Sequence, residues 1–356
     1  MTSKYLQLSN ILTEKIRNGV YPVGTRLPTE IELTSSYSVS RQTVRLALSV
    51  LVEKGLISKK QGSGNSVIST GLSTENRRIA IIASHTNDYI FPAVLHDIQT
   101  VLTHNNYSSQ IISTHNKVSL EQEALQLVLS QSFAGVLAEG VKTALPNPNL
   151  PLYKTLKKRN IPLVFFHGGY AELEKAVCVT DDNFTGGYQL TRYLLSKGHT
   201  CIGGIFNSDD LQGRQRYEGY VTALHDAGLP LPDDKLLWFS TEDRYSIVDC
   251  QDFSLLSNYI KNRLFGCTAI VVYNDEIAYY MIKNLQAAGY DLPSAMSVVS
   301  FDNSYYCSLS PLNITSLSHE GDQIGIVAAN QLLGIIGGKE TNSVSIPWKL
   351  IERQSG

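Results

Sequence analysis

Four side chains close to residue 40 combine positive charge with hydrogen-bonding groups at a spacing that suits a helix. Arg41 and Arg45 are four residues apart, so a helix would place them on one face, with Gln42 and Thr43 beside them. Arginine can bond guanine or grip a phosphate, and glutamine can pair with adenine. Because a helix N-terminus also favours nearby phosphates, this segment predicts a helix that binds DNA. A solvated helix face is the alternative interpretation of the two arginines taken alone.

A second set of polar and aromatic side chains follows short apolar runs further along the chain. It mixes carboxylates, amides and rings, which suits a neutral polyhydroxyl ligand: polar groups bond the hydroxyls and a ring covers the C–H side. No glycine-rich nucleotide loop, nucleophile elbow or metal-ligand spacing accompanies the set, so we expect no catalytic residues, no metal and no cofactor. The set comprises residues 84–91, Glu139, His167, Tyr170, Asp181, Asp182, Asn207, Asn274, Asp275 and Asp302.

The first 70 residues supply neighbours that could position the arginine-bearing helix. Apolar residues recur at helical spacing over residues 6–16, and Thr29 with Glu32 is a capping-box pattern that opens a second helix ending near residue 36. Ser40 is a good N-cap for a third helix, which runs until Gly55. Strands over 56–60 and 66–69, joined by a glycine-containing tip, predict a wing. The side chains expected to face inward from the second and third helices are Ile31, Leu33, Val44, Leu48, Leu51 and Val52.

The charge of the chain is distributed unevenly. The net charge is −2, yet residues 1–70 carry nine Lys or Arg against four acidic side chains, so the rest of the chain is mildly anionic. Cationic side chains that neutralise phosphates supply much of the affinity for DNA. The front of the chain is therefore the part that suits a polyanion.

After a polar stretch at residues 72–78, short apolar strands alternate with helical segments. This alternation predicts parallel β-α-β units in two doubly wound lobes, with ligands bound beyond the carboxyl ends of the strands. The predicted strands are 79–83, 109–113, 135–138, 162–166 and 176–179 in the first series, and 201–205, 236–239, 269–272 and 297–300 in the second. The predicted helices are 94–103, 120–129, 185–196, 217–226 and 276–288.

Residues 3–69 resemble the winged helix-turn-helix of the GntR family of regulators. The resemblance rests on linked motifs: RLPTE at 26–30, SVSRQTVRLAL at 38–48, LVEKGLI at 51–57 and GSG at 62–64. It implies that Arg41, Thr43 and Arg45 contact operator DNA, that Glu30 supports them, and that Gln61 and Gly62 reach the minor groove from the wing. Ser38 replaces the usual turn glycine, and residues 65–66 depart from the usual threonine-aromatic pair.

Residues 77–356 resemble the effector fold of LacI regulators and periplasmic binding proteins. The motifs are DNFTGGY at 182–188, LLSKGH at 194–199, RQRYEGY at 214–220, NDEIA at 274–278 and SFDN at 300–303. The resemblance implies that Arg216, Asn274 and Asp302 bond the ligand. A GntR head on such a body is the arrangement of AraR-type arabinose repressors, to which Lys4-Tyr5, DYIFP at 88–92, YAEL at 170–173 and IERQS at 351–355 are also similar. It adds Lys4 and Tyr5 to the DNA-binding set and Tyr89, Phe91, Glu139, His167 and Asp181 to the cleft.

The expected fold is α/β, with a winged helix-turn-helix followed by a two-lobed domain of doubly wound parallel sheets. The expected parts are a DNA-binding domain at 1–70, a linker at 71–78 and an effector-binding and dimerisation domain at 79–356. Lobe I is expected at about 79–179 and 314–338, and lobe II at about 180–313 and 339–356. Five widely spaced cysteines and the absence of a signal peptide or membrane span predict a cytoplasmic chain without a disulfide framework.

These features predict a homodimeric repressor that binds double-stranded operator DNA and leaves it when a small neutral sugar fills the cleft. By resemblance the effector is L-arabinose. Another pentose, a nucleoside or a purine stays open as the effector, as does activation in place of repression. A sugar-metabolising enzyme lacks support because no catalytic motif is present. A transport protein would have no use for residues 3–69.

Overall fold

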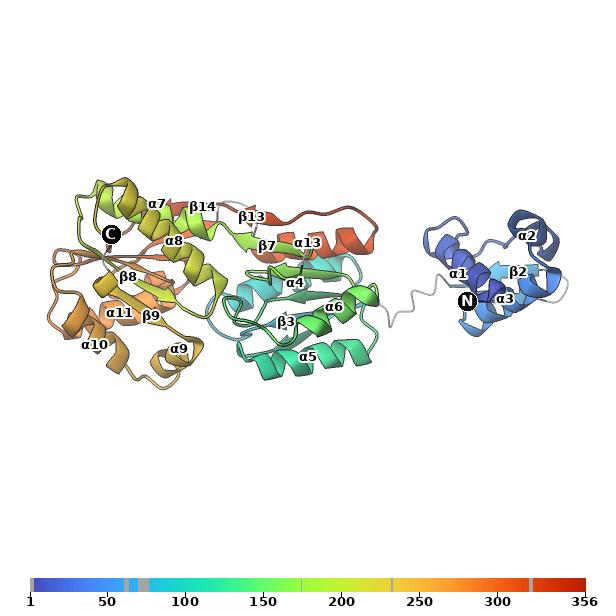
Figure 1. Cartoon of the computed structure of the whole chain (residues 1–356), viewed down its shortest axis with the longest axis horizontal. Coiled ribbons are helices and arrows are strands. Elements are labelled where there is room, and N and C mark those ends of the chain that lie inside the picture. The colour runs from blue at the N-terminus through green and yellow to red at the C-terminus, as the bar shows by residue number, and fades with distance from the viewer. Residues whose placement is uncertain (1–2, 61–63, 70–76, 174, 232, 320–322) are drawn as a thin grey trace. The chain divides into compact units, whose positions relative to one another are not determined.

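The computed structural model describes residues 3–60, 64–69, 77–173, 175–231, 233–319 and 323–356. It divides into two compact units, Met1–Arg77 and Arg78–Gly356 (Figure 1). The boundary between the units lies within the predicted linker.

Within its described residues, the smaller unit has three helices and a two-stranded antiparallel sheet, the predicted winged helix-turn-helix. Thr29 and Glu32 form the predicted capping box, in which the Glu32 carboxylate accepts the Thr29 N–H at 2.7 Å. Ser38, between the second and third helices, has a φ of 50°. It therefore adopts the left-handed backbone that a turn glycine takes more easily. The elements are α1 (Lys4–Arg17), α2 (Glu30–Tyr37), α3 (Arg41–Glu53), β1 (Ile57–Lys60) and β2 (Gly64–Val67).

The core of this unit lies where the apolar faces of the three helices meet. Leu33, Val44, Leu48 and Leu51 are buried as predicted, together with the α1 residues Leu8, Leu12 and Ile16. The prediction was wrong for Ile31 and Val52, which are 64% and 42% exposed. A helix turns by about 100° per residue, so Ile31, two positions before Leu33, lies on the opposite side of α2. Val52 is one position after Leu51 and is therefore turned away from the buried stripe of α3.

The larger unit contains two lobes, each built on a sheet. The lobe I sheet is parallel throughout, and as described it has the order β13-β7-β6-β5-β3-β4. Its strands are β3 (Arg78–Ala83), β4 (Ser108–Ser113), β5 (Gly135–Ala138), β6 (Leu163–Phe166), β7 (Val177–Asp181) and β13 (Val344–Ile346). Four helices of the described chain pack on it: α4 (Phe91–His104), α5 (Val118–Ser130), α6 (Leu150–Lys158) and α13 (Ile324–Ile336).

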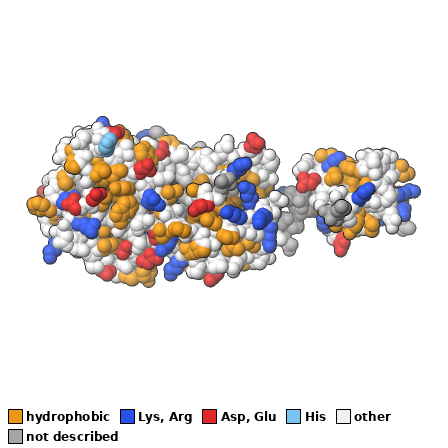
Figure 2. Space-filling view, in the orientation of Figure 1, with side chains coloured by type: hydrophobic (Ala, Val, Ile, Leu, Met, Phe, Trp, Pro, Cys, Tyr) orange, Lys and Arg blue, Asp and Glu red, His pale blue; other side chains and the backbone are white. Residues whose placement is uncertain are grey.

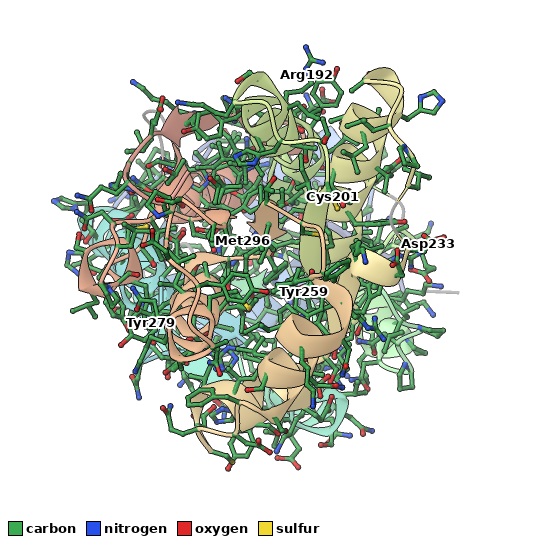
Figure 3. All side chains as sticks on the ribbon, turned by 90° about the vertical axis from the view of Figure 1, so that its left-hand side faces the viewer. Arg192, Cys201, Asp233, Tyr259, Tyr279 and Met296 are labelled. Atoms are coloured by element: carbon green, nitrogen blue, oxygen red, sulfur yellow. The ribbon has the colours of Figure 1, made fainter. Side chains whose placement is uncertain are left out.

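The lobe II sheet has the described order β14-β12-β11-β10-β8-β9, with an antiparallel pair at β12 and β14. Its strands are β8 (Ile202–Asn207), β9 (Leu236–Phe239), β10 (Ala269–Val272), β11 (Ser297–Phe301), β12 (Thr315–His319) and β14 (Trp348–Ile351). Its α-helices are α7 (Asn183–Ser196), α8 (Leu211–Asp226), α9 (Thr241–Val248), α10 (Ser254–Arg263), α11 (Asp275–Ala287) and α12 (Tyr306–Leu309). Figure 3 looks onto the outer end of this lobe, where Tyr259 and Met296 belong to its buried core. All five cysteines are free thiols.

The chain passes from one lobe to the other three times: after β7, after β12 and between β13 and β14. The predicted lobe boundaries are corrected at two places. Residues 314–338 were assigned to lobe I, but β12 pairs with β11 of lobe II. Residues 339–356 were assigned to lobe II, but β13 pairs with β7 of lobe I. Both strands are short and were not recognised as strands in the sequence.

The surface of the larger unit shows acidic and basic side chains interspersed, on the face that Figure 2 displays. Among the described residues, no helix has the length and apolar character needed to cross a membrane.

Candidate DNA-binding and effector sites

The N-terminal turns of α3 present two arginines that share one carboxylate. Arg45 Nε donates to Glu30 Oε2 at 2.9 Å, and Arg41 Nε lies 3.6 Å from the same oxygen. The side chains of Arg41 and Arg45 are 62% and 63% exposed. Glu30 begins α2, so the turn between α2 and α3 brings this acid to α3. The arrangement orients two cations while leaving their guanidinium groups open to a partner.

The other predicted DNA-binding residues are placed less uniformly. Gln42 is exposed on α3. Thr43 is partly buried, and its hydroxyl lies 2.8 Å from the hydroxyl of the N-cap Ser40. Lys4 is exposed at the start of α1, whereas Tyr5 packs against the core of the unit. Gln61 and Gly62 lie outside the described residues.

The eight predicted effector residues all line one cleft between the lobes, which holds about 890 Å³ of empty space including its open mouth. Most come from the ends of strands and the segments that follow them, where parallel sheets place their ligand sites, and Arg216 comes from α8. Tyr89, Phe91, Glu139, His167 and Asp181 face the cleft from lobe I, and Arg216, Asn274 and Asp302 face it from lobe II. The sequence therefore identified residues that the fold brings together from seven separate segments of the chain.

Arg216 is an almost fully buried arginine in the cleft wall. Its guanidinium lies 4.1 Å from the centre of the Phe301 ring. It donates to Asn183 Oδ1 at 2.9 Å and to the Tyr273 carbonyl, and its Nη2 lies 3.4 Å from Asp302 Oδ1. Burial lowers the pKa of Arg216, but the surrounding acids, Asp302 foremost, raise it by more, so the group stays charged.

Two glycines allow α8 to bring Arg216 to this position. A Cβ at Gly187 of α7 would lie 2.0 Å from the Arg216 carbonyl oxygen, and one at Gly219 of α8 would lie 2.0 Å from that of Phe184. Both distances are far below van der Waals contact, so the close crossing of α7 and α8 requires glycine at both positions.

Tyr89 links the two lobes at the base of the cleft. Its hydroxyl donates to an oxygen of Asp302 and accepts the N–H of Asp275 at 3.3 Å. Tyr89, His167 and Asp302 all have positive φ, at 56°, 59° and 94°. Such backbone strain in non-glycine residues concentrates at functional sites, and here three strained residues converge on one cleft.

Two histidine–carboxylate pairs complete the wall. His167 Nδ1 lies 3.2 Å from Glu139 Oε1, and His319 Nε2 lies 2.7 Å from Asp181 Oδ1. Burial raises the pKa of Glu139 and of Asp181, but the histidine partners outweigh it and the net pKa of each acid is lowered. Burial lowers the pKa of His167, but Glu139 outweighs that effect and the net pKa is raised. Glu139 and Asp181 are therefore each matched by a histidine within the protein.

Asn274 has a structural role as well as a place in the cleft. Its Oδ1 accepts the Ile277 N–H at 3.0 Å and so caps α11. The cleft also contains groups that sequence reasoning left out of the site, notably Gln212, Tyr273 and Arg244, and His319 stands behind Asp181. His319 lies at the end of β12, a strand whose polar sequence gave no signal. Among the described residues, no group of three or more His, Cys, Asp or Glu is placed to hold a metal ion.

Comparison with known proteins assigns the chain to a family. Residues 4–67 match the model of the gntR family of bacterial regulatory proteins, and residues 191–356 match a periplasmic binding protein-like domain. The arabinose metabolism transcriptional repressor of Halalkalibacterium halodurans is 32% identical over 94% of this chain and 90% of its own length. The chain belongs to this repressor family. The repressor of the same name from Geobacillus stearothermophilus is 30% identical over 96% of the chain and 93% of its own length.

Solved structures agree on the fold of this family member. A complex of the transcriptional regulator CelR with cellobiose has a TM-score of 0.67 at 20% identity and covers 89% of the chain and 92% of its own. The transcription regulator GntR from Chromobacterium violaceum has a TM-score of 0.68 at 23% identity, over 78% of this chain and 98% of its own. The family is one of DNA-binding transcriptional regulators, so the chain is a transcriptional regulator and not an enzyme.

Proposed function

We propose that this repressor binds operator DNA as a homodimer through α3 of each head and releases it when L-arabinose enters the cleft. The observation that carries the proposal is the cleft itself, in which polar groups converge from both lobes and Glu139, Asp181 and Asp302 each have a histidine or arginine partner within the protein. A charged ligand would need an unmatched partner in the wall. A neutral polyol needs the donors, acceptors and ring surface that the wall provides.

The geometry suggests how the sugar would be held. The carboxylates of Asp181 and Asp302 are acceptors for hydroxyl groups, and the amide of Gln212 offers both donor and acceptor capacity. The ring of Phe91 lies in the wall as an apolar surface for the C–H side of the sugar. The related repressors are named for arabinose metabolism, which favours this pentose over other polyols.

Release from DNA follows by linkage between the two sites. The sugar contacts both lobes, so it favours the state in which they are closed around it. In a dimer of the larger units, a change in lobe angle alters the spacing of the two heads and hence the fit of both α3 helices to a palindromic operator. The sugar must therefore prefer the state with the lower DNA affinity.

The proposal is tested in two stages with the full chain. Calorimetric titration compares L-arabinose with D-xylose, D-ribose, adenosine and hypoxanthine, and sedimentation measures the oligomeric state. A gel shift then uses a duplex selected by the protein from a random library, with and without the bound ligand. We expect saturable binding of L-arabinose and dissociation of the complex by it. Tighter binding of adenosine or hypoxanthine, or retention on DNA at saturating L-arabinose, would contradict the proposal.

A further inference from the structure

The first turn of α9 in lobe II touches lobe I at three points along one edge of the cleft, and Asn116, Thr241 and Arg244 among the residues involved also line the cleft. Each contact joins a loop of lobe I to a side chain of this turn, and each is short enough for a direct hydrogen bond. The contacts are Asn116 Nδ2 to Thr241 Oγ1 at 2.7 Å, Lys142 Nζ to Glu242 Oε1 at 2.7 Å and Arg244 Nη2 to Asp88 Oδ2 at 2.8 Å.

These contacts lie on the side of the cleft opposite the segments that connect the lobes. In Figure 1 the crossing region of β7, α7, β13 and β14 runs along the upper side of the two lobes, and α9 lies on the lower side. A rotation that opens the cleft about the crossings would separate α9 from lobe I first. The three contacts therefore exist together only when the lobes are closed.

The lobe I partners are held in place before closure by contacts within their own lobe. Lys142 has a φ of 46°, and its backbone N–H donates to Asn116 Oδ1 at 2.9 Å. The loop that carries Lys142 is anchored by the buried carboxylate of Glu121, which accepts from Asn147 Nδ2 at 2.8 Å and from the Tyr170 hydroxyl at 2.6 Å. The cation thus projects from a preformed loop.

The lobe II partners are also held in place by contacts within their own lobe. Arg244 makes two bonds to the carboxylate of Glu276, at 2.7 and 2.9 Å, and Glu276 is 1% exposed. The Thr241 N–H donates to Asp209 Oδ2 at 3.1 Å, and Lys142 Nζ lies 3.4 Å from the same oxygen. Preorganised partners lose little side-chain entropy when they meet, so their contacts retain more of their attraction.

We propose that Lys142, Glu242, Asp88 and Arg244 form an electrostatic clasp that sets the affinity of the cleft for its sugar by stabilising the closed lobes. The inference rests on the proposed function of the cleft. Lys142, Glu242 and Asp88 stand outside the described lining of the cleft, so they act through closure and not by touching the ligand. Glu242 and Asp88 are 69% and 41% exposed, and salt screens pairs that are open to water. A neutral sugar should therefore bind with an affinity that falls as ionic strength rises.

The test uses the full chain and a double variant, Lys142→Gln with Asp88→Asn. Both changes are on lobe I, so the buried pair of Arg244 and Glu276 is kept and the fold should survive. Calorimetry with L-arabinose at 0.05 M and 0.5 M KCl should show a Kd in low salt that is about three- to tenfold higher for the variant, the range expected for two partly exposed pairs. The difference should shrink in high salt. Lys154→Gln, an exposed change on α6, should behave as the wild type.

A second measurement does not depend on the sugar. Hydrogen exchange of residues 139–145 and 241–248 in the ligand-free chain should be faster in the double variant than in the Lys154→Gln control. The clasp would be overturned if hydrogen exchange were the same in the double variant and the control. It would also be overturned if the double variant and the wild type bound the sugar with equal affinity at both salt concentrations. If L-arabinose does not bind the wild type, the proposed effector is wrong, and the exchange rates still decide whether the clasp exists.

Discussion

Arg45 Nε donates to Glu30 Oε2 at 2.9 Å, and this bond ties the recognition helix of the head to the helix before it. The pair is open to solvent, so its contribution to folding stability is small. Its significance lies in the direction it gives the Arg45 side chain, which remains 63% exposed.

Arg45→Ala should weaken operator binding by about 1–3 kcal/mol, the cost of losing an arginine contact to a base or phosphate. Sugar affinity should stay the same, because Arg45 belongs to the other unit. Fluorescence anisotropy with the selected duplex measures the first quantity and calorimetry the second. Arg192→Ala, which removes the same charge from the exposed face of α7 in lobe II (Figure 3), is the matched control. An equal loss of DNA affinity in both variants would point to overall charge and not to a recognition helix.

Glu30→Gln should keep the fold and reduce operator affinity by a smaller amount, about 1 kcal/mol, because the arginines lose their anchor but keep their charge. The loss should be greatest for the selected duplex and least for random DNA. A gain in affinity for both duplexes would show that Glu30 restrains the arginines by charge and does not orient them.

Asp302→Asn should lower the affinity for L-arabinose by about 1.5–3 kcal/mol, since a hydrogen bond to a charged acceptor is lost. The variant should still bind the operator but stay on it at sugar concentrations that release the wild type. Gel shift across a sugar titration checks this. Asp226→Asn, exposed on α8, should release normally; if it also fails to release, lost charge at Asp302 is not the cause.

The two sites differ in how far sequence reasoning could reach. Seven of the eight effector residues lie at or shortly after the end of a strand, and parallel strands place their carboxyl ends together. The eighth, Arg216, lies on α8 and was predicted from the family resemblance alone. The sequence did not show that β12 and β13 are strands or which sheet each one joins. Strands of three to five residues carry too little periodicity, and tertiary pairing decides their sheet. The cross-lobe partners of Lys142 and Arg244 were missed for a related reason: no sequence pattern encodes which loops meet when two lobes close.

The pair of His167 and Glu139 should make the stability of the larger unit depend on pH. The folded pKa of His167 is raised, so the stabilisation from the pair is complete below the ordinary pKa of about 6.5 and is lost as pH rises through the raised value. His167→Gln should cost about 2 kcal/mol at pH 6 and progressively less towards pH 9. Thermal unfolding at intervals across this range measures the trend. A penalty that is constant with pH would show that His167 is neutral throughout.

Gly219→Ala should destabilise the larger unit by about 3 kcal/mol, because the new methyl group would meet the Phe184 carbonyl at 2.0 Å and force α7 and α8 apart. Sugar affinity should fall as well, since Arg216 is carried by α8. Gly337→Ala is the control, as its backbone φ is −78° and the nearest atom to a new Cβ is 3.3 Å away. Equal unfolding midpoints for the two variants would contradict the requirement for a close crossing.

The three passages of the chain between the lobes also govern the order in which the protein can form during synthesis. The elements of the head are contiguous and are complete once β2 has been made, whereas β13 and β14, among the last strands translated, close the outer edges of the two different sheets. Neither half of the sensor can finish its sheet on the ribosome until almost the whole polypeptide has emerged. A nascent chain therefore contains a complete winged helix-turn-helix before it contains the two complete sheets whose strand ends form the cleft.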